Sequence, residues 1–203
     1  MQGMSVTEHW QMRDAVRHEP TDEDLLKLAC TGKREGMEGL VSRYQQPLYR
    51  FLQRFLDSSE DAEQATLNVF IRAWEYAPRF QYRAKVSTWL FRIAVNLAHD
   101  MHTSRKRRPV LEEFPDEEKL THSLMGNAED EALEQIEREE QQLRLRKVLQ
   151  SMNETDRLLL VLYYFEDRSY EEMHEISGLS YTVIKTRLSR ARQKLRILLE
   201  RAS

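Results

Sequence analysis

Apolar side chains recur at steps of three and four residues along the segment 40–55, and this repeat constrains the fold most. The apolar positions are Leu40, Val41, Tyr44, Leu48, Phe51, Leu52 and Phe55. Such spacing places apolar groups on one face of a helix. The 203 residues include only 6 glycines and 5 prolines, so the chain has few of the residues that form tight turns between strands. The sequence therefore predicts an all-α fold, in which Pro47 kinks or breaks this helix.

Three further helices are expected in the first half of the chain. A short one follows Thr21, which is succeeded by three acids in the pattern of a helix N-cap. Another covers residues 62–76. A third begins at Ser87 or Thr88 and runs to about Ser104. The first half is therefore predicted to be a bundle of about four helices.

The second half contains the pattern of a helix-turn-helix. Ser169 is followed at the third position by Glu172, the spacing of a capping box. Gly178 interrupts the pattern, and Ser180 can cap a second helix that is rich in basic residues. The apolar residues expected to face inward from this second helix are Val183, Ile184, Leu188 and Ala191. A helix of this kind offers polar groups to base edges and cations to phosphates.

Charge is segregated along the chain, although the net charge is only -3. Residues 185–201 carry seven bases and the single acid Glu200, and residues 105–108 form a second basic block. The acids are concentrated between these blocks, with twelve carboxylates in the segments 112–118 and 129–140. This arrangement indicates two anion-binding surfaces on either side of an acidic connector.

These observations divide the chain into four parts. We expect a flexible N-terminal extension over residues 1–20, a first helical domain over 21–108, an acidic flexible linker over 109–130, and a second helical domain over 131–203. The linker contains proline, glycine and acids with scattered apolar residues.

A cytoplasmic protein without membrane insertion is expected from three further features. Cys30 is the one cysteine, so no disulfide forms within the chain. The longest apolar run, residues 158–165, is much shorter than the ~20 residues that cross a bilayer. The N-terminus also lacks the apolar centre of a signal peptide.

Four ordered segments resemble one known family. RYQQPLYRFLQRFL, DAEQATLNVFIRAW, STWLFRIAVNLAHD and SYEEMHEISGLSYTVIKTRLSRARQKLR are similar to the signature segments of the extracytoplasmic-function (ECF) group of bacterial RNA polymerase sigma factors, in the sigma-70 family. The resemblance covers nearly all of the chain from Thr21 to Glu200. It implies that the first domain is sigma-2, which binds core polymerase and opens the minus-ten promoter element, and that the second is sigma-4, which reads the minus-35 element as duplex.

The resemblance implies a helix over residues 61–74 that binds the beta-prime clamp of core polymerase. The residues expected to form this interface are Asp61, Glu63, Phe70, Arg72 and Trp74. We expect the charged ones to face outward and the two aromatic ones to anchor the helix. The family usually has acidic or amide residues where this chain has Gln64, Leu67 and Asn68, so the charge complementarity is reduced to Asp61 and Glu63.

The opened minus-ten strand is expected to lie on the helix that begins near Ser87. Unstacked bases are held by aromatic or apolar pockets together with cations along the backbone. The candidate residues are Arg83, Lys85, Trp89, Arg92, Asn96, Arg105 and Lys106. Asn96 matches the family asparagine that faces a flipped base, while helical spacing favours a mainly structural role for Trp89. The loop 81–85 departs from the small, acidic stretch that is usual in the family.

Duplex minus-35 DNA is expected to contact the second helix of the helix-turn-helix. The candidate residues are Ser180, Tyr181, Thr182, Lys185, Thr186, Arg187, Ser189, Arg190 and Arg192. Thr182 and Val183 stand where glycine and threonine are usual. His174 replaces a small residue between the two helices and is expected to open their packing.

Two other classes of protein fit the sequence less well. An enzyme would need more than His99, Asp100 and His102, which have a metal-binding spacing but no third ligand at a fixed spacing, phosphate loop or nucleophile motif. No catalysis, metal or cofactor is therefore expected. A simple helix-turn-helix repressor or activator would not need the helix around Asn96. The expected partners are core RNA polymerase and promoter DNA, both duplex and single-stranded, and the sequence leaves open whether an anti-sigma factor holds the chain.

Overall fold

The computed structural model describes residues 19–56, 58–107 and 129–201, and every regular element in these ranges is a helix. The elements are α2 (Asp22–Cys30), α3 (Arg34–Phe55), α4 (Ser59–Tyr76), the 3-10 turn η1 (Ala77–Arg79), α5 (Val86–Arg107), α6 (Glu129–Gln150), α7 (Glu154–Tyr164), α8 (Tyr170–Ser177) and α9 (Tyr181–Arg201). The all-α prediction is confirmed. Of the linker expected over residues 109–130, all but the last two residues lie outside the described ranges, and those two begin α6.

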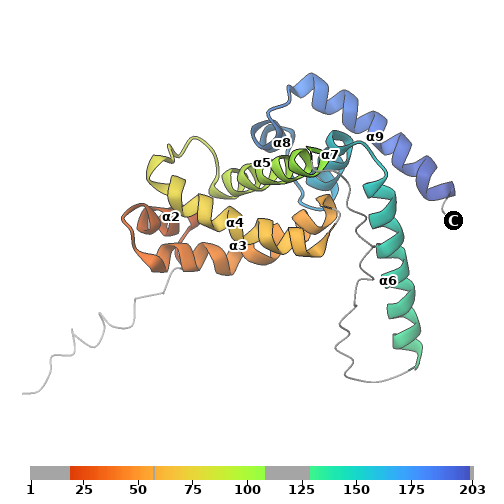
Figure 1. The fold of residues 1–203 in the computed structure, drawn as a ribbon, viewed down its shortest axis with the longest axis horizontal. Coiled ribbons are helices and arrows are strands. Elements are labelled where there is room, and N and C mark those ends of the chain that lie inside the picture. The colour runs from red at the N-terminus through yellow and green to blue at the C-terminus, as the bar shows by residue number, and fades with distance from the viewer. Residues whose placement is uncertain (1–18, 57, 108–128, 202–203) are drawn as a thin grey trace, which may run out of the picture.

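Helix α5 lies at the centre of the described structure. It packs against α3 and α4 on one side and against α8 on the other. In Figure 1, α9 runs along the outside of α7 and α8, and α6 extends away from the rest of the helices. The first four helices and the last four are therefore in direct contact in this structure.

Helix α3 continues through Pro47, so the prediction that the helix breaks at this residue is wrong. Proline removes one intrahelical hydrogen bond, to the carbonyl four residues earlier. The turns that follow bury Leu48, Phe51, Leu52 and Phe55 completely. We attribute the continuity of the helix to this burial, because packing of an apolar face commonly overrides local propensity.

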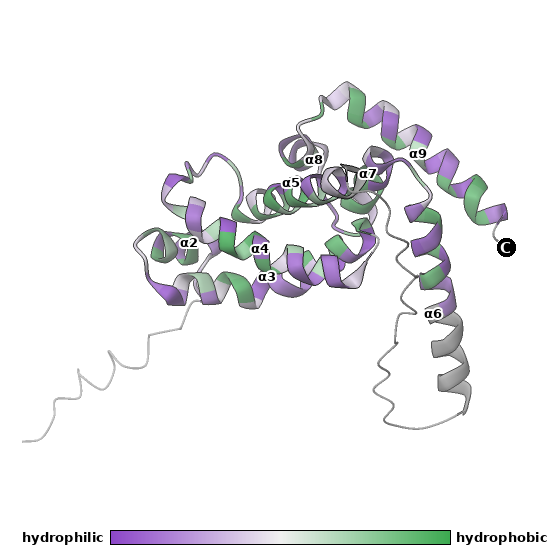
Figure 2. Ribbon diagram, in the orientation of Figure 1, coloured by the Kyte–Doolittle hydropathy of each residue, from purple (hydrophilic) through white to green (hydrophobic). Residues whose placement is uncertain are grey.

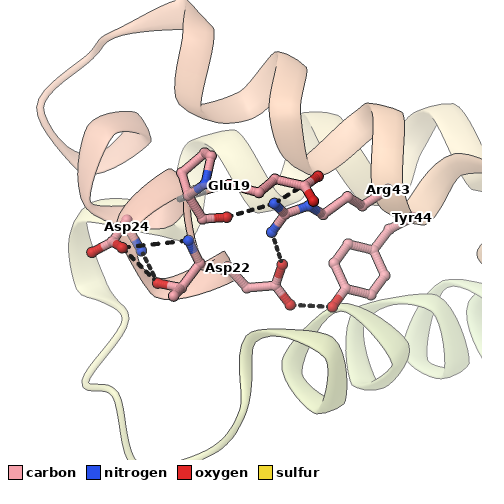
Figure 3. A network of polar contacts seen from close by, with 7 residues as sticks. Glu19, Asp22, Asp24, Arg43 and Tyr44 are labelled. Atoms are coloured by element: carbon pink, nitrogen blue, oxygen red, sulfur yellow. Dashed lines mark hydrogen bonds and ion pairs between the residues drawn. The ribbon is translucent and has the colours of Figure 1, made fainter. Parts of the chain in front are cut away.

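A polar network joins α2 to α3 (Figure 3). Arg43 donates to the Asp22 carboxylate at 2.7 Å and to the carbonyl of Pro20, and it pairs with Glu19 at 3.3 Å. The Tyr44 hydroxyl donates to the second carboxylate oxygen of Asp22. Burial and this carboxylate raise the pKa of Tyr44, so the phenol stays protonated and remains a donor. Glu19 and Pro20, the end of the segment expected to be a flexible extension, thus contact α3.

The helix starts follow from their capping residues. Thr21 caps α2 in a complete capping box with Asp24, as its acidic first turn predicted. Ser58 caps α4, which begins at Ser59, three residues before the expected start. Helix α5 begins at Val86 and continues to Arg107, one residue earlier and three residues later than expected. Such shifts of one to three residues are common, because helix ends are the least determined part of the pattern.

The core runs through both halves of the described chain. Figure 2 shows that α5 is largely apolar, whereas α9 alternates between apolar and polar residues. Leu90, Ile93 and Leu97 of α5 are buried, as helical spacing predicted. Because α5 is apolar on two sides, it packs against both halves, and its remaining exposed strip carries the polar residues considered next.

Candidate nucleic-acid interface

One long face of α9 is exposed and carries the residues predicted to touch duplex DNA. Ile184, Leu188 and Ala191 are buried and hold the helix against α7 and α8. All nine candidates are exposed: Ser180, Tyr181, Thr182, Lys185, Thr186, Arg187, Ser189, Arg190 and Arg192. Val183, which was expected to face inward, is 38% exposed, so that prediction is wrong. With Ile184 buried, its neighbour Val183 is turned about 100° around the helix and points away from the core.

The turn between α8 and α9 has the geometry of a helix-turn-helix. Ser169 and Glu172 form a complete capping box at the start of α8. Gly178 ends α8 at φ 71°, a left-handed conformation that favours glycine. The backbone of Ile184 donates to the Ser180 carbonyl at 2.9 Å, which completes the first turn of α9.

His174 closes this turn and does not open it, in contrast to the expectation. Its Nδ1 lies 2.7 Å from the Leu179 carbonyl oxygen, which can only accept, so Nδ1 carries the proton. The His174 ring lies 5.4 Å from the ring of Tyr181. Desolvation and the Glu171 carboxylate raise the pKa of Tyr181, so its phenol stays protonated at the exposed start of α9. Histidine therefore fits here because its ring reaches both the turn and the recognition helix.

Several cations of α9 have partners within the second half. Arg187 pairs with Asp156 at 3.2 Å. The Lys185 ammonium and the Arg192 guanidinium each lie 5.9 Å from an aromatic ring centre, of Tyr170 and Tyr163 respectively. These contacts are exposed and weak. Because each contact is weak, it does not prevent the cation from moving to phosphate or to a base.

A second candidate surface lies on α5 and on the loop before it. Trp89, Arg92 and Asn96 follow one another at steps of three and four residues and share one face of the helix. Arg92 and Asn96 are exposed, and Trp89 is half-buried. Arg83 and Lys85 are exposed in the loop. Arg105 and Lys106 lie in the last turn of α5, but their side chains fall outside the described part of the structure.

Two aromatic residues that sequence reasoning did not select extend this surface. The Phe80 ring lies 4.8 Å from that of Trp89 and 5.0 Å from that of Tyr82, between ring centres. Tyr82 has φ 54°, which is uncommon for a residue other than glycine and turns its half-exposed ring back onto Phe80. Aromatic residues on both sides of a basic loop are the sequence signal that would have identified this platform. Trp89 is accordingly part of an aromatic cluster as well as the core.

The exposed face of α4 is more apolar than predicted. Glu63 is exposed, Asp61 is half-buried, and Arg72 pairs with Asp100 at 3.5 Å. Phe70 is buried and anchors the helix, as expected. Trp74 is 38% exposed, so the expectation that it also anchors the helix is wrong. Trp74 borders a groove of about 560 Å³, whose lining is Arg34, Met37, Glu38, Val41, Ser42 and Trp74.

Two further apolar residues of α4 reach the solvent. Leu67 is 64% exposed and Ile71 is 48% exposed. With Trp74, they recur at steps of four and three residues and form one stripe along the helix. Sequence reasoning named Leu67 only as a departure from the family pattern. An exposed apolar stripe of this kind indicates a protein-binding surface.

Within residues 19–56, 58–107 and 129–201, no cluster of histidine, cysteine or carboxylate side chains could hold a metal ion. His99 instead pairs with Glu154 across the two halves, with Nδ1 and Oε1 2.6 Å apart. His102 packs edge-on against Phe55. None of the helices in these ranges has a stretch both long and apolar enough to span a bilayer.

Comparison with known proteins gives a consistent result. The family model for sigma-70 region 2 matches residues 40–108, and the model for sigma-70, region 4 matches residues 142–195. The chain is 30% identical to the RNA polymerase sigma factor NccH of Alcaligenes xylosoxydans xylosoxydans over 184 residues, which is 88% of this chain and 95% of the relative. It is 27% identical to the RNA polymerase sigma-H factor of Pseudomonas aeruginosa over 181 residues, 86% of this chain and 91% of the relative.

A solved structure is also similar over most of the chain. CnrH, in complex with the cytosolic domain of CnrY, superposes with a TM-score of 0.66 at 25% identity. The match covers 90% of this chain and 99% of CnrH. The arrangement of helices described above thus recurs in a protein of known structure.

Proposed function

Because the chain belongs to the ECF group of the sigma-70 family of RNA polymerase sigma factors, it acts in promoter recognition and transcription initiation, and we propose that its two halves divide this work. Residues 21–108 form the sigma-2 domain, which binds core polymerase and opens the minus-ten element. Residues 131–203 form the sigma-4 domain, which reads the minus-35 element. Residues 109–130 link the two. The protein acts in the cytoplasm, where the promoters are, and catalyses no reaction itself.

The exposed polar face of α9 is the observation that best supports minus-35 reading. It combines hydroxyl groups, Lys185 and Arg187 on the second helix of the helix-turn-helix. Side chains of these types reach guanine edges and phosphates in the major groove.

The polar strip of α5 supports minus-ten opening in the same way. Asn96 is exposed one turn after Arg92. It lies on the same face of α5 as Trp89, which belongs to the aromatic cluster with Phe80 and Tyr82. An amide reads a flipped base with both a donor and an acceptor, while aromatic rings stack on its neighbours.

Two kinds of protein partner follow from the same reasoning. The Leu67, Ile71 and Trp74 stripe of α4 is proposed to bind the beta-prime clamp of core polymerase. A second regulatory protein, such as an anti-sigma factor, is also a proposed partner, because CnrH, which is similar over nearly the whole chain, has been solved with another protein, the cytosolic domain of CnrY.

Reconstituted transcription tests this function most directly. The full chain would be added to bacterial core polymerase with a pool of promoter fragments, and the ends of the transcripts would be mapped. We expect starts at a fixed distance from a shared pair of sequence elements. Transcripts no more abundant or specific than those of core polymerase alone would contradict the function.

The two DNA surfaces should be separable by mutation. Arg187→Ala is expected to weaken duplex minus-35 binding by about 1 to 3 kcal/mol if the guanidinium contacts a base edge, and by less if it contacts phosphate. Asn96→Ala should leave duplex binding unchanged and reduce promoter opening, measured by permanganate reactivity of unpaired thymines. Arg196→Ala is the matched control, because Arg196 is exposed on α9 and pairs with Glu200. Normal opening by Asn96→Ala would exclude the assigned role.

A further inference from the structure

One histidine lies between the two helices of the helix-turn-helix. His174 is on α8, and the centre of its ring lies 5.4 Å from that of Tyr181, the first residue of α9. Its Nδ1 donates to the Leu179 carbonyl oxygen in the turn, at 2.7 Å. The imidazole is therefore held at two points, one in the turn and one at the start of the second helix.

The other ring nitrogen of His174 is not needed for this placement. The side chain is exposed, and no hydrogen bond joins Nε2 to another residue in the described part of the chain. Because Nδ1 carries the proton of the neutral ring, Nε2 is then only an acceptor. Protonation adds an N–H at Nε2 and leaves the bond from Nδ1 to Leu179 in place. The ring can thus gain a charged, outward donor without losing its position.

Two acidic residues of α8 lie near this ring. Glu171 is three positions before His174, on the same face of the helix, and Glu175 is the next residue. Desolvation raises the pKa of the Tyr181 phenol, and the carboxylates of Glu171 and Glu175 raise it further, so both acids lie near the start of α9. The entry to the second helix therefore carries two negative charges, which repel a phosphate.

The charged groups of the neighbouring elements are engaged elsewhere. The ammonium of Lys185 on α9 lies over an aromatic ring of α8, 5.9 Å from its centre. Lys85 and Arg168 both pair with Glu172, at 3.0 and 3.8 Å, and Glu172 is two positions from His174 and so on the other side of α8. Asp156 of α7 pairs with an arginine of α9. Within the described ranges, this leaves the two acids of α8 to face the His174 ring.

The DNA backbone passes close to this point when a helix-turn-helix binds duplex. The N-terminal residues of the second helix contact base edges, while the first helix crosses the phosphate backbone. His174 belongs to the first helix and contacts the first residue of the second, so it lies between these two sets of contacts. Phosphate and sugar receive half or more of the hydrogen bonds that proteins make to DNA. A charged N–H at Nε2 is a strong donor for a phosphate oxygen.

We propose that the imidazolium form of His174 binds a backbone phosphate of the minus-35 element, so that promoter binding by this chain strengthens as the pH falls. This inference rests on the proposed function. Neutral His174 presents only an acceptor to the phosphate, beside two carboxylates that repel it. The charged ring presents a donor and offsets one of these negative charges. Because a small residue is usual at this position in the family, the contact is particular to this chain.

The pH dependence follows from proton uptake on binding. Histidine side chains ordinarily change their charge between pH 5 and 8. A phosphate beside the ring favours the charged form, so in this range the DNA complex binds more protons than its separate parts. The affinity therefore rises as the pH falls, and the gain is complete once the ring is also protonated in the free protein. From pH 8 to pH 6 we expect His174 to raise the affinity for a promoter about fivefold.

Two substitutions distinguish the nitrogens of the ring. His174→Asn puts an amide nitrogen in the place of Nδ1, which keeps a donor for Leu179 and leaves nothing at Nε2. His174→Gln puts an amide nitrogen near the place of Nε2, where it donates at every pH. Each full-length protein, bound to core polymerase, would be titrated with a promoter fragment selected by the transcription assay, at pH 8 and pH 6 and one ionic strength. We expect the about fivefold gain in the wild type beyond that of either variant.

Neutral backbone positions locate the contact on the DNA. A methylphosphonate carries a methyl group in place of the charged phosphate oxygen, so it removes one negative charge at a chosen position. Promoter fragments with single methylphosphonates across the minus-35 element would be compared at the same two pH values. We expect one position to abolish the extra pH response of the wild type, and the same position to leave the pH response of His174→Asn unchanged. A purely structural role of His174 in the turn would not depend on any single phosphate.

The outcomes distinguish this proposal from the proposed function. Equal pH responses of the wild type and His174→Asn would overturn the proposal, as would a wild-type response that persists with every methylphosphonate in turn. If a variant fails to fold, as measured by circular dichroism, the methylphosphonate series on the wild type still decides, because it needs no substitution. A wild-type chain that directs no specific transcription at any pH would overturn the proposed function, and this inference with it.

Discussion

A chain that carries Leu67→Glu and Ile71→Glu is expected to bind core polymerase about 100-fold more weakly, or worse. Leu67 is 64% exposed and Ile71 is 48% exposed, on the same face of α4 as Trp74. Fully burying one such side chain contributes about 1.5 to 3 kcal/mol. Because each is already partly covered in the free chain, losing both is worth roughly 1.7 to 3.4 kcal/mol, a range that includes the roughly 2.8 kcal/mol that a factor of 100 requires. A buried carboxylate without a partner adds a further cost.

The fold should survive these changes, because substitutions at exposed positions usually alter stability by less than about 0.5 kcal/mol. Affinity would be measured by titrating core polymerase into labelled full-length chain. Leu67→Met with Ile71→Leu is the matched control, since it keeps the stripe apolar and should bind as the wild type does. Unchanged affinity of the glutamate variant would exclude this face of α4 as the polymerase contact.

Salt separates the apolar stripe from the acids of the same helix. The acidic residues Asp61 and Glu63 were expected to supply the charge complementarity to the clamp. Contacts between exposed charges weaken as ionic strength rises, with a Debye length of about 10 Å at 0.1 M, whereas apolar burial does not. If the stripe dominates, Asp61→Lys with Glu63→Lys should have a modest effect that disappears at high salt. The glutamate variant should remain impaired at every salt concentration.

Local chemistry made much of the second half predictable. Ser169, Glu172 and Gly178 act within a few residues of one another, so their spacing was enough to predict the capping box and the turn. The outward face of α9 followed from Ile184 and Leu188, although Val183 shows that one apolar residue beside the buried row need not be buried. Predictions of this kind succeed where neighbours in sequence are also neighbours in space.

The exposed face of α4 was harder to predict, because apolar residues occur on nearly every side of this helix. Leu67, Phe70 and Ile71 lie within five positions, yet only Phe70 is buried. Periodicity identifies a helix in such a segment but not which of two apolar faces meets the core. That choice depends on how α3 and α5 pack against it, which is a tertiary property.

The contact between the two halves could not be predicted from any local sequence pattern. Arg54 and Phe165 are more than a hundred positions apart, as are Arg157 and Phe55, and each pair meets as a cation over a ring. No sequence pattern singles out Arg54 as a residue that contacts the other half. Side chains that act across the fold are recognised only when the fold brings them together.

The close packing of α2 against α3 depends on Gly36, whose role could not be predicted from the sequence either. A Cβ atom at Gly36 would lie 2.3 Å from the Leu25 carbonyl oxygen and 2.6 Å from the Ala29 nitrogen, both in the backbone of α2. A Cβ at Gly39 would instead meet the tip of the Leu25 side chain, at 2.6 Å from Cδ2. Backbone atoms of α2 can make room for a Cβ at Gly36 only if the whole helix moves, whereas the end of the Leu25 side chain can rotate away from a Cβ at Gly39. The two positions in α3 therefore provide a test substitution and its control.

Gly36→Ala is accordingly expected to destabilise the protein by about 2 kcal/mol or more, because overpacking against backbone outweighs the gain of about 1 kcal/mol that alanine brings to a helix. Gly39→Ala should be neutral or slightly stabilising, since it brings the same gain and Leu25 can adjust. Urea unfolding followed by circular dichroism measures both changes against the wild type. A loss of α2 from α3 would also release the Arg43 and Asp22 pair, so Gly36→Ala should expose the first helix to proteolysis before the rest of the chain. Equal stability of the two variants would mean that α2 does not approach α3 closely at Gly36.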